Sequence, residues 1–288
     1  MTDIMEENTY TGFSIRSNIY WKYSRFRTWF HNYRTSEIQL MRQNLNVTRP
    51  LRGTKSGPAL IAATGPSLSQ IDQSTLLHFR NLGSLFGINQ YATSPKGALV
   101  PPNYLVLNDE PFWNDSNESV VGAVKRMKEL ILSRDIPCIV QPAHRKTLFQ
   151  EAQTVFFHGI PLTGFHFGNR IDRLNSLPNI TMFQAIATAK YLGYSPIYLV
   201  GYDLTFVKYL STSSDGYSLE PHHHGSEQEK SIPLSSFRRS LSDLFGSMAF
   251  QIESLKQFKT TAVQIGYESF IDTLPRTSEK QLRSKLGL

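Results

Sequence analysis

Cysteine is almost absent from this chain, which rules out a fold held together by internal disulfide bonds. The single thiol, Cys138, lies in the apolar run 136–141, which is typical of a buried strand, so we expect an inert core thiol and not a nucleophile. Long apolar runs are also missing, since no stretch approaches the length that spans a bilayer. Acidic residues at positions 3, 6 and 7, with no apolar core beside them, argue against a secretory signal. We therefore expect a cytoplasmic protein.

Acidic residues are scarce in residues 8–55, where nine Lys and Arg stand against one acid, Glu37. The formal net charge of the whole protein is +7, so the rest of the chain is close to neutral. Because the positive charge is confined to one segment, it does not favour nucleic-acid binding by the whole fold.

The same segment is rich in aromatic residues, which recur mostly every three or four positions between Tyr20 and Tyr33. That spacing predicts a helix with one broad aromatic face. Three partners stay open for this face: the main domain or a second copy of the chain, an anionic membrane surface, or nucleic acid. A membrane contact through residues 13–55 would place the protein on the inner face of the cell membrane.

From Pro58 onward, apolar runs of strand length alternate with helical periodicity. Several runs are almost continuously apolar, as in strands that are covered on both faces. We therefore predict an α/β, Rossmann-like fold with a mostly parallel, doubly wound sheet over residues 57–288, preceded by a helical extension over residues 1–56. Residues 207–235 are polar and aperiodic, so we expect a long lid loop there. The expected strands are 59–63, 84–88, 104–107, 138–140, 154–157, 197–200 and 262–265, and the expected helices are 119–132, 182–192 and 236–258.

The first expected strand ends in Thr64-Gly65-Pro66-Ser67, and a helix is expected to follow. Gly65 allows a tight turn and the close approach of a ligand to the backbone, and Pro66 stiffens the turn. Ser67 is expected to cap the helix, with Gln70 as its capping-box partner. The first amide hydrogens of the helix would then attract an anion. The segment predicts either a nucleotide or phosphate site or an ordinary capped turn.

The clearest helix–strand unit covers residues 181–203. Thr181 is expected to cap its helix and Gly193 to end it. The strand stops at Gly201, so Asp203 lies just beyond its carboxyl end, where open α/β sheets bind ligands. Asp203 is expected to accept from a ribose or sugar hydroxyl or to act in acid–base chemistry, with a turn cap as the alternative.

Two further strand ends carry amides, Asn89 with Gln90 after the second strand and Asn108 after the third. An amide offers both a donor and an acceptor, which suits ribose hydroxyls or the edge of a base. Each of these residues alone is also an ordinary turn residue.

The expected lid loop contains Tyr209, Tyr217 and the run His222-His223-His224. Histidine is the side chain best suited to proton transfer near neutral pH, which favours a general acid or base in this loop. A plain surface loop and a metal site are the alternatives. Adjacent histidines point in different directions, which argues against a closed zinc site.

These motifs resemble the bacterial sialyltransferases of glycosyltransferase family 42. They are also similar to a wider group that includes motility accessory factors and an archaeal pterin pyrophosphokinase branch. The resemblance covers roughly residues 57–275 and depends on short motifs: Gly65-Pro66-Ser67-Leu68, Ile71-Asp72, Asn89-Gln90-Tyr91, Asn108, and the unit from Thr181 through 192–194 to 197–203.

The resemblance implies a CMP-linked sugar donor, no metal and no cofactor. It places Gly65, Pro66 and Ser67 against the donor phosphate, Asn89 and Asn108 near the phosphate and sugar, and Thr181 near the cytidine. It implies that Tyr209 and Tyr217 steady the leaving phosphate and that one of His222, His223 and His224, with His224 favoured, is the general base. Tyr267 and Ser269 would lie in a nucleotide-binding turn.

The sequence thus leads to the hypothesis of an inverting glycosyltransferase of polysaccharide biosynthesis. It would move a sialic acid-like sugar or another nonulosonate from a CMP-linked donor to a surface glycan or glycolipid. An enzyme of pyrophosphokinase type is the first alternative, and it would need magnesium held by Asp109, Glu110 or Asp203. A non-catalytic module bound to membrane or nucleic acid through residues 13–55 is the second.

Overall fold

The structure is a computed structural model of the 288-residue chain. It describes residues 46, 48–107, 118–140, 154–156, 159–161, 175–177, 181–204, 210–213, 216–219, 230–232, 248–249, 251–252, 255–266 and 269–288. The predicted aromatic helix lies outside these residues, and so does most of the helix expected over 236–258. The predicted domain boundary at residues 56 and 57 stays a prediction.

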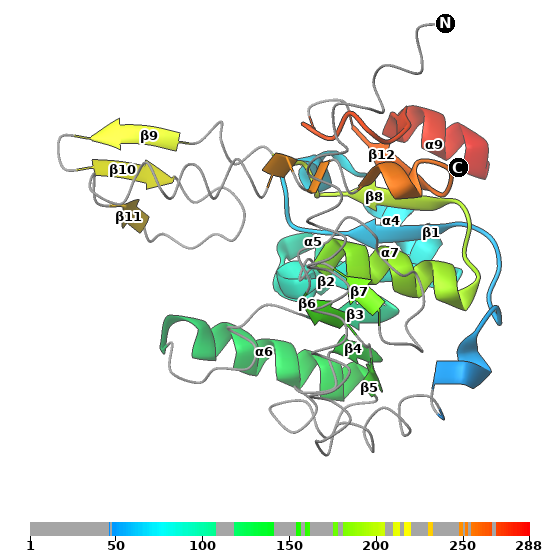
Figure 1. Cartoon of the computed structure of the whole chain (residues 1–288). Coiled ribbons are helices and arrows are strands. Elements are labelled where there is room, and N and C mark those ends of the chain that lie inside the picture. Colours follow the sequence, from blue (N-terminus) through cyan, green and yellow to red (C-terminus); the bar gives the residue numbers. More distant parts are fainter. Residues whose placement is uncertain are drawn as a thin grey trace, which may run out of the picture.

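Eight strands form the main sheet in the order β13-β12-β8-β1-β2-β3-β4-β5 (Figure 1). Every neighbouring pair in this sheet is parallel. The predicted α/β class with a parallel, doubly wound sheet is therefore confirmed. The strands are β1 (Ala59–Ala62), β2 (Leu85–Ile88), β3 (Tyr104–Val106), β4 (Cys138–Val140), β5 (Thr154–Phe156), β8 (Ile197–Val200), β12 (Ala262–Ile265) and β13 (Arg276–Thr277).

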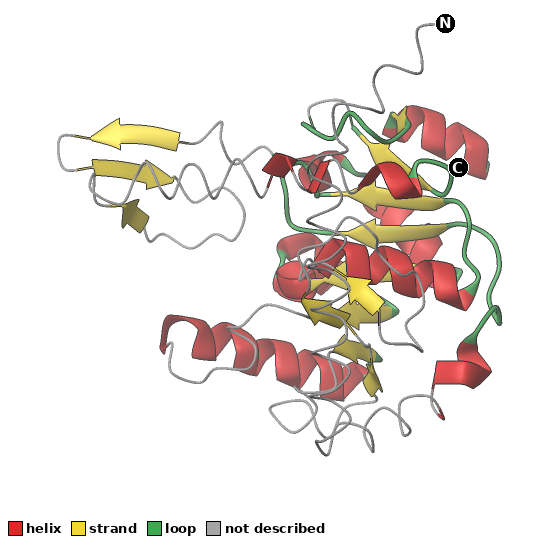
Figure 2. Ribbon diagram, viewed as in Figure 1, coloured by secondary structure: helices red, strands yellow, loops and turns green. Residues whose placement is uncertain are grey.

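Helices cover both faces of the sheet (Figure 2). The α-helices are α3 (Ser67–Gln70), α4 (Gln73–Asn81), α5 (Pro95–Leu99), α6 (Glu118–Arg134), α7 (Thr181–Leu192) and α9 (Glu279–Leu286), and the short 3₁₀ helices are η1 (Arg49–Leu51), η2 (Asn89–Thr93) and η6 (Lys256–Phe258). Gly193 ends α7 with φ +111°, as predicted. Thr181 is the first residue of α7 and not the cap before it.

Two apolar cores lie on opposite faces of the sheet, and β1 contributes to both. Ala59 and Ile61 pack with α7, whereas Leu60 and Ala62 pack with residues of α4 and α9. Side chains alternate between the faces of a strand, so a strand covered on both sides must be apolar throughout. This explains why the strongest strand signals of the sequence are continuous runs without alternation.

The single cysteine belongs to this interior. Cys138 in β4 is fully buried, and desolvation raises the pKa of its thiol to about 12. The predicted location in a buried strand is confirmed.

The region expected to be a long lid loop, 207–235, contains a three-stranded antiparallel sheet formed by β9 (Leu210–Ser213), β10 (Gly216–Leu219) and β11 (Lys230–Ile232). These strands are mostly polar, so they lack the continuous apolar runs by which the equally short strands of the main sheet were predicted. This small sheet lies beyond the end of the main sheet toward which β1 and β8 point (Figure 1). A further two-stranded pair, β6 (Gly159–Pro161) with β7 (Asn175–Leu177), was not expected either.

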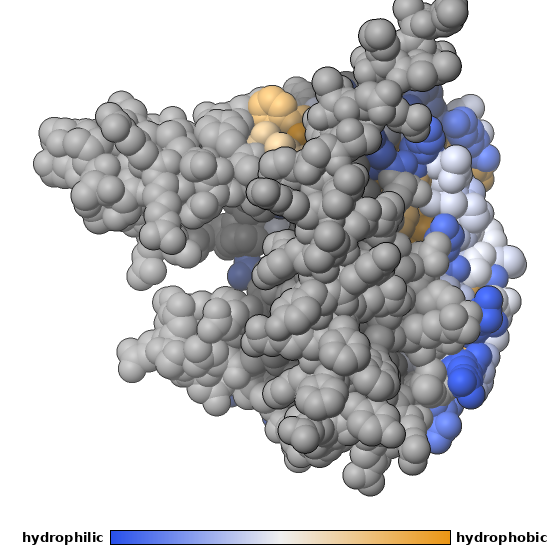
Figure 3. Space-filling model, in the orientation of Figure 1, coloured by the Kyte–Doolittle hydropathy of each residue, from blue (hydrophilic) through white to orange (hydrophobic). Residues whose placement is uncertain are grey.

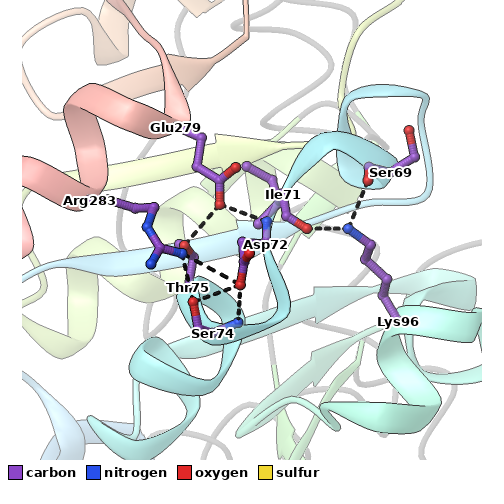
Figure 4. Close-up of polar contacts among 8 residues, drawn as sticks. All are labelled: Ser69, Ile71, Asp72, Ser74, Thr75, Lys96, Glu279 and Arg283. Carbon is purple, nitrogen blue, oxygen red and sulfur yellow. Dashed lines mark hydrogen bonds and ion pairs between the residues drawn. The ribbon is translucent and has the colours of Figure 1, made fainter. Parts of the chain in front are cut away.

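The C-terminal helix α9 is attached to the start of α4 by a polar network (Figure 4). One Glu279 oxygen accepts from the Asp72 amide at 2.6 Å and from the Thr75 hydroxyl at 2.9 Å. The Arg283 guanidinium lies 3.4 Å from the Asp72 carboxylate and donates to Ser74 Oγ at 2.6 Å. The Asp72 side chain also caps α4 by accepting from the Ser74 amide. The network therefore ties α9 to the start of α4.

The chain before β1 is attached to the end of α7. The amides of Gly53 and Lys55 donate to the carbonyls of Tyr191 and Leu192, at 3.0 and 2.9 Å, and the Tyr191 hydroxyl donates to the Thr48 carbonyl at 3.2 Å. The last carbonyls of a helix have no partner within the helix, so this segment satisfies two of them.

Candidate functional site

The carboxyl ends of β1 and β8 form the topological switch point of the main sheet. From β1 the chain winds outward through β2, β3 and β4, and it returns to β8 on the other side of β1. Ligands of open α/β sheets bind at such a point. Here it is bordered by residues 63–67 after β1 and 201–204 after β8.

The two turns approach one another so closely that glycine is required on both sides. Gly65 donates its amide hydrogen to the Gly201 carbonyl at 2.8 Å, and a Cβ on Gly65 would lie 2.5 Å from that oxygen. Gly201 has φ +71°, and a Cβ there would lie 2.2 Å from the Ala63 carbonyl oxygen. Gly65 therefore permits the approach of another turn of the same chain, where the sequence had indicated a ligand.

Ser67 and the β8 turn are joined by two reciprocal hydrogen bonds. The Ser67 amide donates to Asp203 Oδ2 at 2.8 Å, and the Gly201 amide donates to Ser67 Oγ at 2.8 Å. The predicted capping box is wrong, because Pro66 takes the cap position without a side-chain bond and Ser67 is already helical. The serine hydroxyl is instead engaged by the neighbouring turn.

The amide hydrogens that follow Thr64 are thus already taken. Those of Gly65 and Ser67 go to the β8 turn, and that of Leu68 goes to the Gly65 carbonyl. The prediction that they are free to receive a phosphate is wrong. The turn does attract an anion, as expected of a helix start, but that anion is the protein's own Asp203 carboxylate. A donor phosphate beside these residues would have to bind through other groups.

Asp203 is 4 % exposed and holds several segments together. Besides Ser67, its carboxylate accepts from Gln264 Nε2 at 3.5 Å, and its backbone carbonyl accepts from the Ser269 hydroxyl at 3.1 Å. The Phe270 amide donates to the same carbonyl at 3.0 Å. These contacts match the turn-capping alternative for Asp203, and they bring the predicted site residues Asp203, Ser67 and Ser269 together.

A second group of predicted residues meets at the start of α7. Asn89 Nδ2 donates to the Thr181 hydroxyl at 3.2 Å, although 92 positions separate the two residues in the sequence. Asn89 has φ +47°, a left-handed conformation that Asn tolerates better than most residues. Gln90, the next residue, is half-buried in η2. The structure therefore places the predicted Asn89 amide next to the start of α7, at the carboxyl edge of β2.

Sequence reasoning missed Gln184, which lies one turn into α7. Gln184 is 1 % exposed, and neither Oε1 nor Nε2 has a hydrogen-bond partner within the described part of the chain. Side chains of a helix point back toward its N-terminus, so the amide extends toward the turn that holds Thr181. A single amide in the otherwise apolar run 182–187 was the signal that could have revealed it.

The remaining candidates cannot be placed. Tyr217 lies in β10, and its side chain is not described. The other candidates lie outside the described residues: Asn108, Asp109, Glu110, Tyr209, His222, His223, His224 and Tyr267. Within the described ranges, no three His, Cys, Asp or Glu side chains are grouped as a metal site, and no helix is long and apolar enough to cross a bilayer.

The chain matches no protein-family model, and no curated protein matches it either. Among solved structures, its fold is similar to the MAf glycosyltransferase from Magnetospirillum magneticum AMB-1, with a TM-score of 0.45 and 14% sequence identity. The similarity covers 84% of this chain but only 39% of that chain. A similarity this distant carries no conclusion about activity.

Proposed function

We propose that the protein is a glycosyltransferase that uses a nucleotide-linked sugar, with a CMP-linked donor favoured. One observation supports this proposal above all: two pairs of residues from the motifs that carry the family resemblance lie at the carboxyl edge of one parallel sheet. Asn89 contacts Thr181 there, and Ser67 contacts Asp203. This is the edge at which such folds bind nucleotides.

In this proposal, the nucleotide binds at the start of α7. The first amides of a helix lack partners within the helix and favour negative charge. Asn89 and Thr181 supply a side-chain amide and a hydroxyl beside that turn. The buried Gln184 amide adds a donor and an acceptor that nothing else in the described residues uses. A polar ligand would satisfy an amide whose burial otherwise destabilises the fold.

The transfer step requires a base on the acceptor and stabilisation of the departing phosphate. His224 is proposed as the base that removes the acceptor hydroxyl proton, and Tyr209 and Tyr217 as hydroxyl donors to the leaving phosphate. A base on one face of the sugar and a leaving group on the other give inversion. Phenol hydroxyls and a helix start can stabilise a monophosphate without a metal ion. Asp203 serves as a positioning residue that holds the turns beneath the donor.

Nucleotide binding is tested first, by thermal unfolding of the full chain with CMP, CDP, UDP, GDP and ATP, each with and without magnesium. A ligand at about 100 times its Kd stabilises the native state by about 2.7 kcal/mol. We expect CMP to raise the melting temperature independently of magnesium. A shift that appears only with ATP and magnesium would replace the proposal by the pyrophosphokinase alternative, and no shift with any nucleotide would refute nucleotide binding.

The variant Gln184→Met tests whether the buried Gln184 amide contributes to CMP binding. Methionine removes the unpaired polar atoms at similar volume, so the unliganded protein should be as stable as the wild type or more stable. The CMP shift should be lost or reduced. The matched control is Thr188→Val, one turn further along α7, where the hydroxyl already bonds to the Gln184 carbonyl at 2.7 Å. An undiminished CMP shift in Gln184→Met would remove this residue from the site.

His224→Ala tests the assignment of the base. We expect transfer to be abolished while the CMP shift survives, because the base acts on the acceptor and not on the nucleotide. Full transfer activity in His224→Ala would refute the role.

A further inference from the structure

Tyr91 is the buried anchor of η2, the 3₁₀ helix that follows β2. Its side chain is fully buried, and its hydroxyl donates to the Val100 carbonyl at 3.1 Å, just after the end of α5. Desolvation raises the pKa of Tyr91, so the hydroxyl stays protonated and remains a donor. The ring is therefore held by the core, and the hydroxyl is held by a backbone carbonyl.

Two glycines leave the space that Tyr91 occupies. A Cβ on Gly87, in β2, would lie 2.6 Å from Cδ1 of the Tyr91 ring, and a Cβ on Gly97, in α5, would lie 1.8 Å from the Tyr91 carbonyl oxygen. Ser94 Oγ donates to the same carbonyl at 2.6 Å and accepts from the Gly97 amide at 3.1 Å. A side chain at either glycine would displace Tyr91, so β2 and α5 together fix the place of η2.

Tyr91 and Asn89 act on opposite faces of the main sheet. Tyr91 packs in the core that contains residues of α4 and α9, whereas Asn89 contacts Thr181 of α7, the helix that packs in the other core. Asn89 Nδ2 donates to the Thr181 hydroxyl at 3.2 Å, and the same hydroxyl lies 3.4 Å from Asn89 Oδ1. The chain thus crosses the carboxyl end of β2 between a buried anchor and a polar contact, and Asn89 makes this turn with φ +47°.

We infer that Tyr91 is a positioning residue, which holds η2 so that the Asn89 amide is presented to the start of α7. The inference rests on the proposed function, in which the nucleotide binds at that helix start. A polar group that is already in place when the ligand arrives loses less conformational entropy on binding. Tyr91 does not touch the ligand in this role and acts through Asn89.

The first measurement needs no ligand. It follows the side-chain amide signal of Asn89 in nitrogen–proton correlation spectra of the full chain, and the signal is identified by its loss in Asn89→Ala. Tyr91→Phe removes the bond to the Val100 carbonyl and should move the Asn89 signal. Gly97→Ala forces a Cβ against the Tyr91 carbonyl and should move it further.

The matched control is Tyr194→Phe, which removes a tyrosine bond to a carbonyl at the other end of β2. Tyr194 is buried, and its hydroxyl donates to the Gly83 carbonyl at 2.8 Å, just before β2 begins. The strands of the main sheet begin on the right-hand flank in Figure 1, where Figure 3 shows hydrophilic residues, so this control lies at the edge opposite to η2. Tyr194→Phe should leave the Asn89 signal in place.

The second measurement is the Kd for CMP. Tyr91→Phe should weaken CMP binding about twofold to tenfold, the range expected for one hydrogen bond, and Tyr194→Phe should leave the Kd unchanged. In an Asn89→Ala background, Tyr91→Phe should have no further effect on the Kd, because Tyr91 acts through Asn89. A tyrosine that only stabilised the fold would not show this dependence on Asn89.

Three results would overturn the inference. The first is an Asn89 signal that neither Tyr91→Phe nor Gly97→Ala moves, or that Tyr194→Phe moves equally. The second is an equal loss of CMP affinity in the two tyrosine variants, and the third is full additivity of Tyr91→Phe and Asn89→Ala. If the wild type binds no CMP, the proposed function fails, and the Asn89 signal alone decides whether Tyr91 positions that amide.

Discussion

The variant Asp203→Ala tests whether the Asp203 carboxylate stabilises the fold or takes part in catalysis. The Ser67 amide donates to Asp203 Oδ2 at 2.8 Å, and both residues are buried. Alanine leaves that amide without its acceptor. Hydrogen bonds to charged groups contribute about 1.5–3 kcal/mol, and an unsatisfied buried donor costs about 1–3 kcal/mol. We therefore expect Asp203→Ala to lower the free energy of unfolding by about 2–3 kcal/mol.

The measurement is urea unfolding followed by circular dichroism, with the slope of free energy against urea checked for constancy. Asp203→Asn should lose less than alanine, because its amide oxygen can still accept from Ser67. Asp272→Ala is the control, since that aspartate is exposed on a nearby connection. If Asp203→Ala unfolds like Asp272→Ala, the carboxylate does not hold the turns together, and its role would have to be chemical.

The remaining predictions concern backbone, thiol and charge. Gly201→Ala should lower the free energy of unfolding by about 1–3 kcal/mol more than Gly57→Ala, as measured by urea unfolding. Both glycines have positive φ, but a Cβ at residue 57 meets open space, whereas a Cβ at residue 201 meets the Ala63 carbonyl. Equal unfolding free energies for the two variants would contradict the close approach of the two turns. Cys138 should stay unreactive toward a thiol reagent at pH 8 until the protein is unfolded, because burial raises the pKa of its thiol to about 12, and labelling of the native state would contradict the buried strand. Hydrogen bonds from Ser74 and the nearby Arg283 hold the pKa of Asp72 below its ordinary value, so its ionised form stabilises the fold above about pH 4 and this contribution is lost as the pH falls. The stability difference between the wild type and Asp72→Asn should therefore shrink on acidification, and a difference that is constant down to pH 2 would contradict it.

The fold class was readable from the sequence because the strands are buried on both faces. A strand such as β1, shared by two cores, is continuously apolar, and that pattern predicted its bounds to within one residue. The strands β9 to β11 could not be predicted in this way, since their residues are mostly polar and form no apolar run.

The candidate site was readable only in part. The sequence indicated that Asn89 and Thr181 belong to one edge, and the structure brings them together. It could not indicate that Asp203 would occupy the turn after β1, because that contact joins residues 136 positions apart. The local sequence predicts a helix start that attracts an anion. Which anion binds there depends on the tertiary fold.

The bonds between the chain before β1 and α7 limit how the protein can be shortened. A version that begins at residue 57 would remove the amide partners of the Tyr191 and Leu192 carbonyls. It would therefore destabilise the end of α7, a helix that contributes to one of the two cores. Loss of function in such a version would report damage to the core as much as loss of the basic extension. A deletion that is meant to remove the extension alone should therefore stop before Thr48.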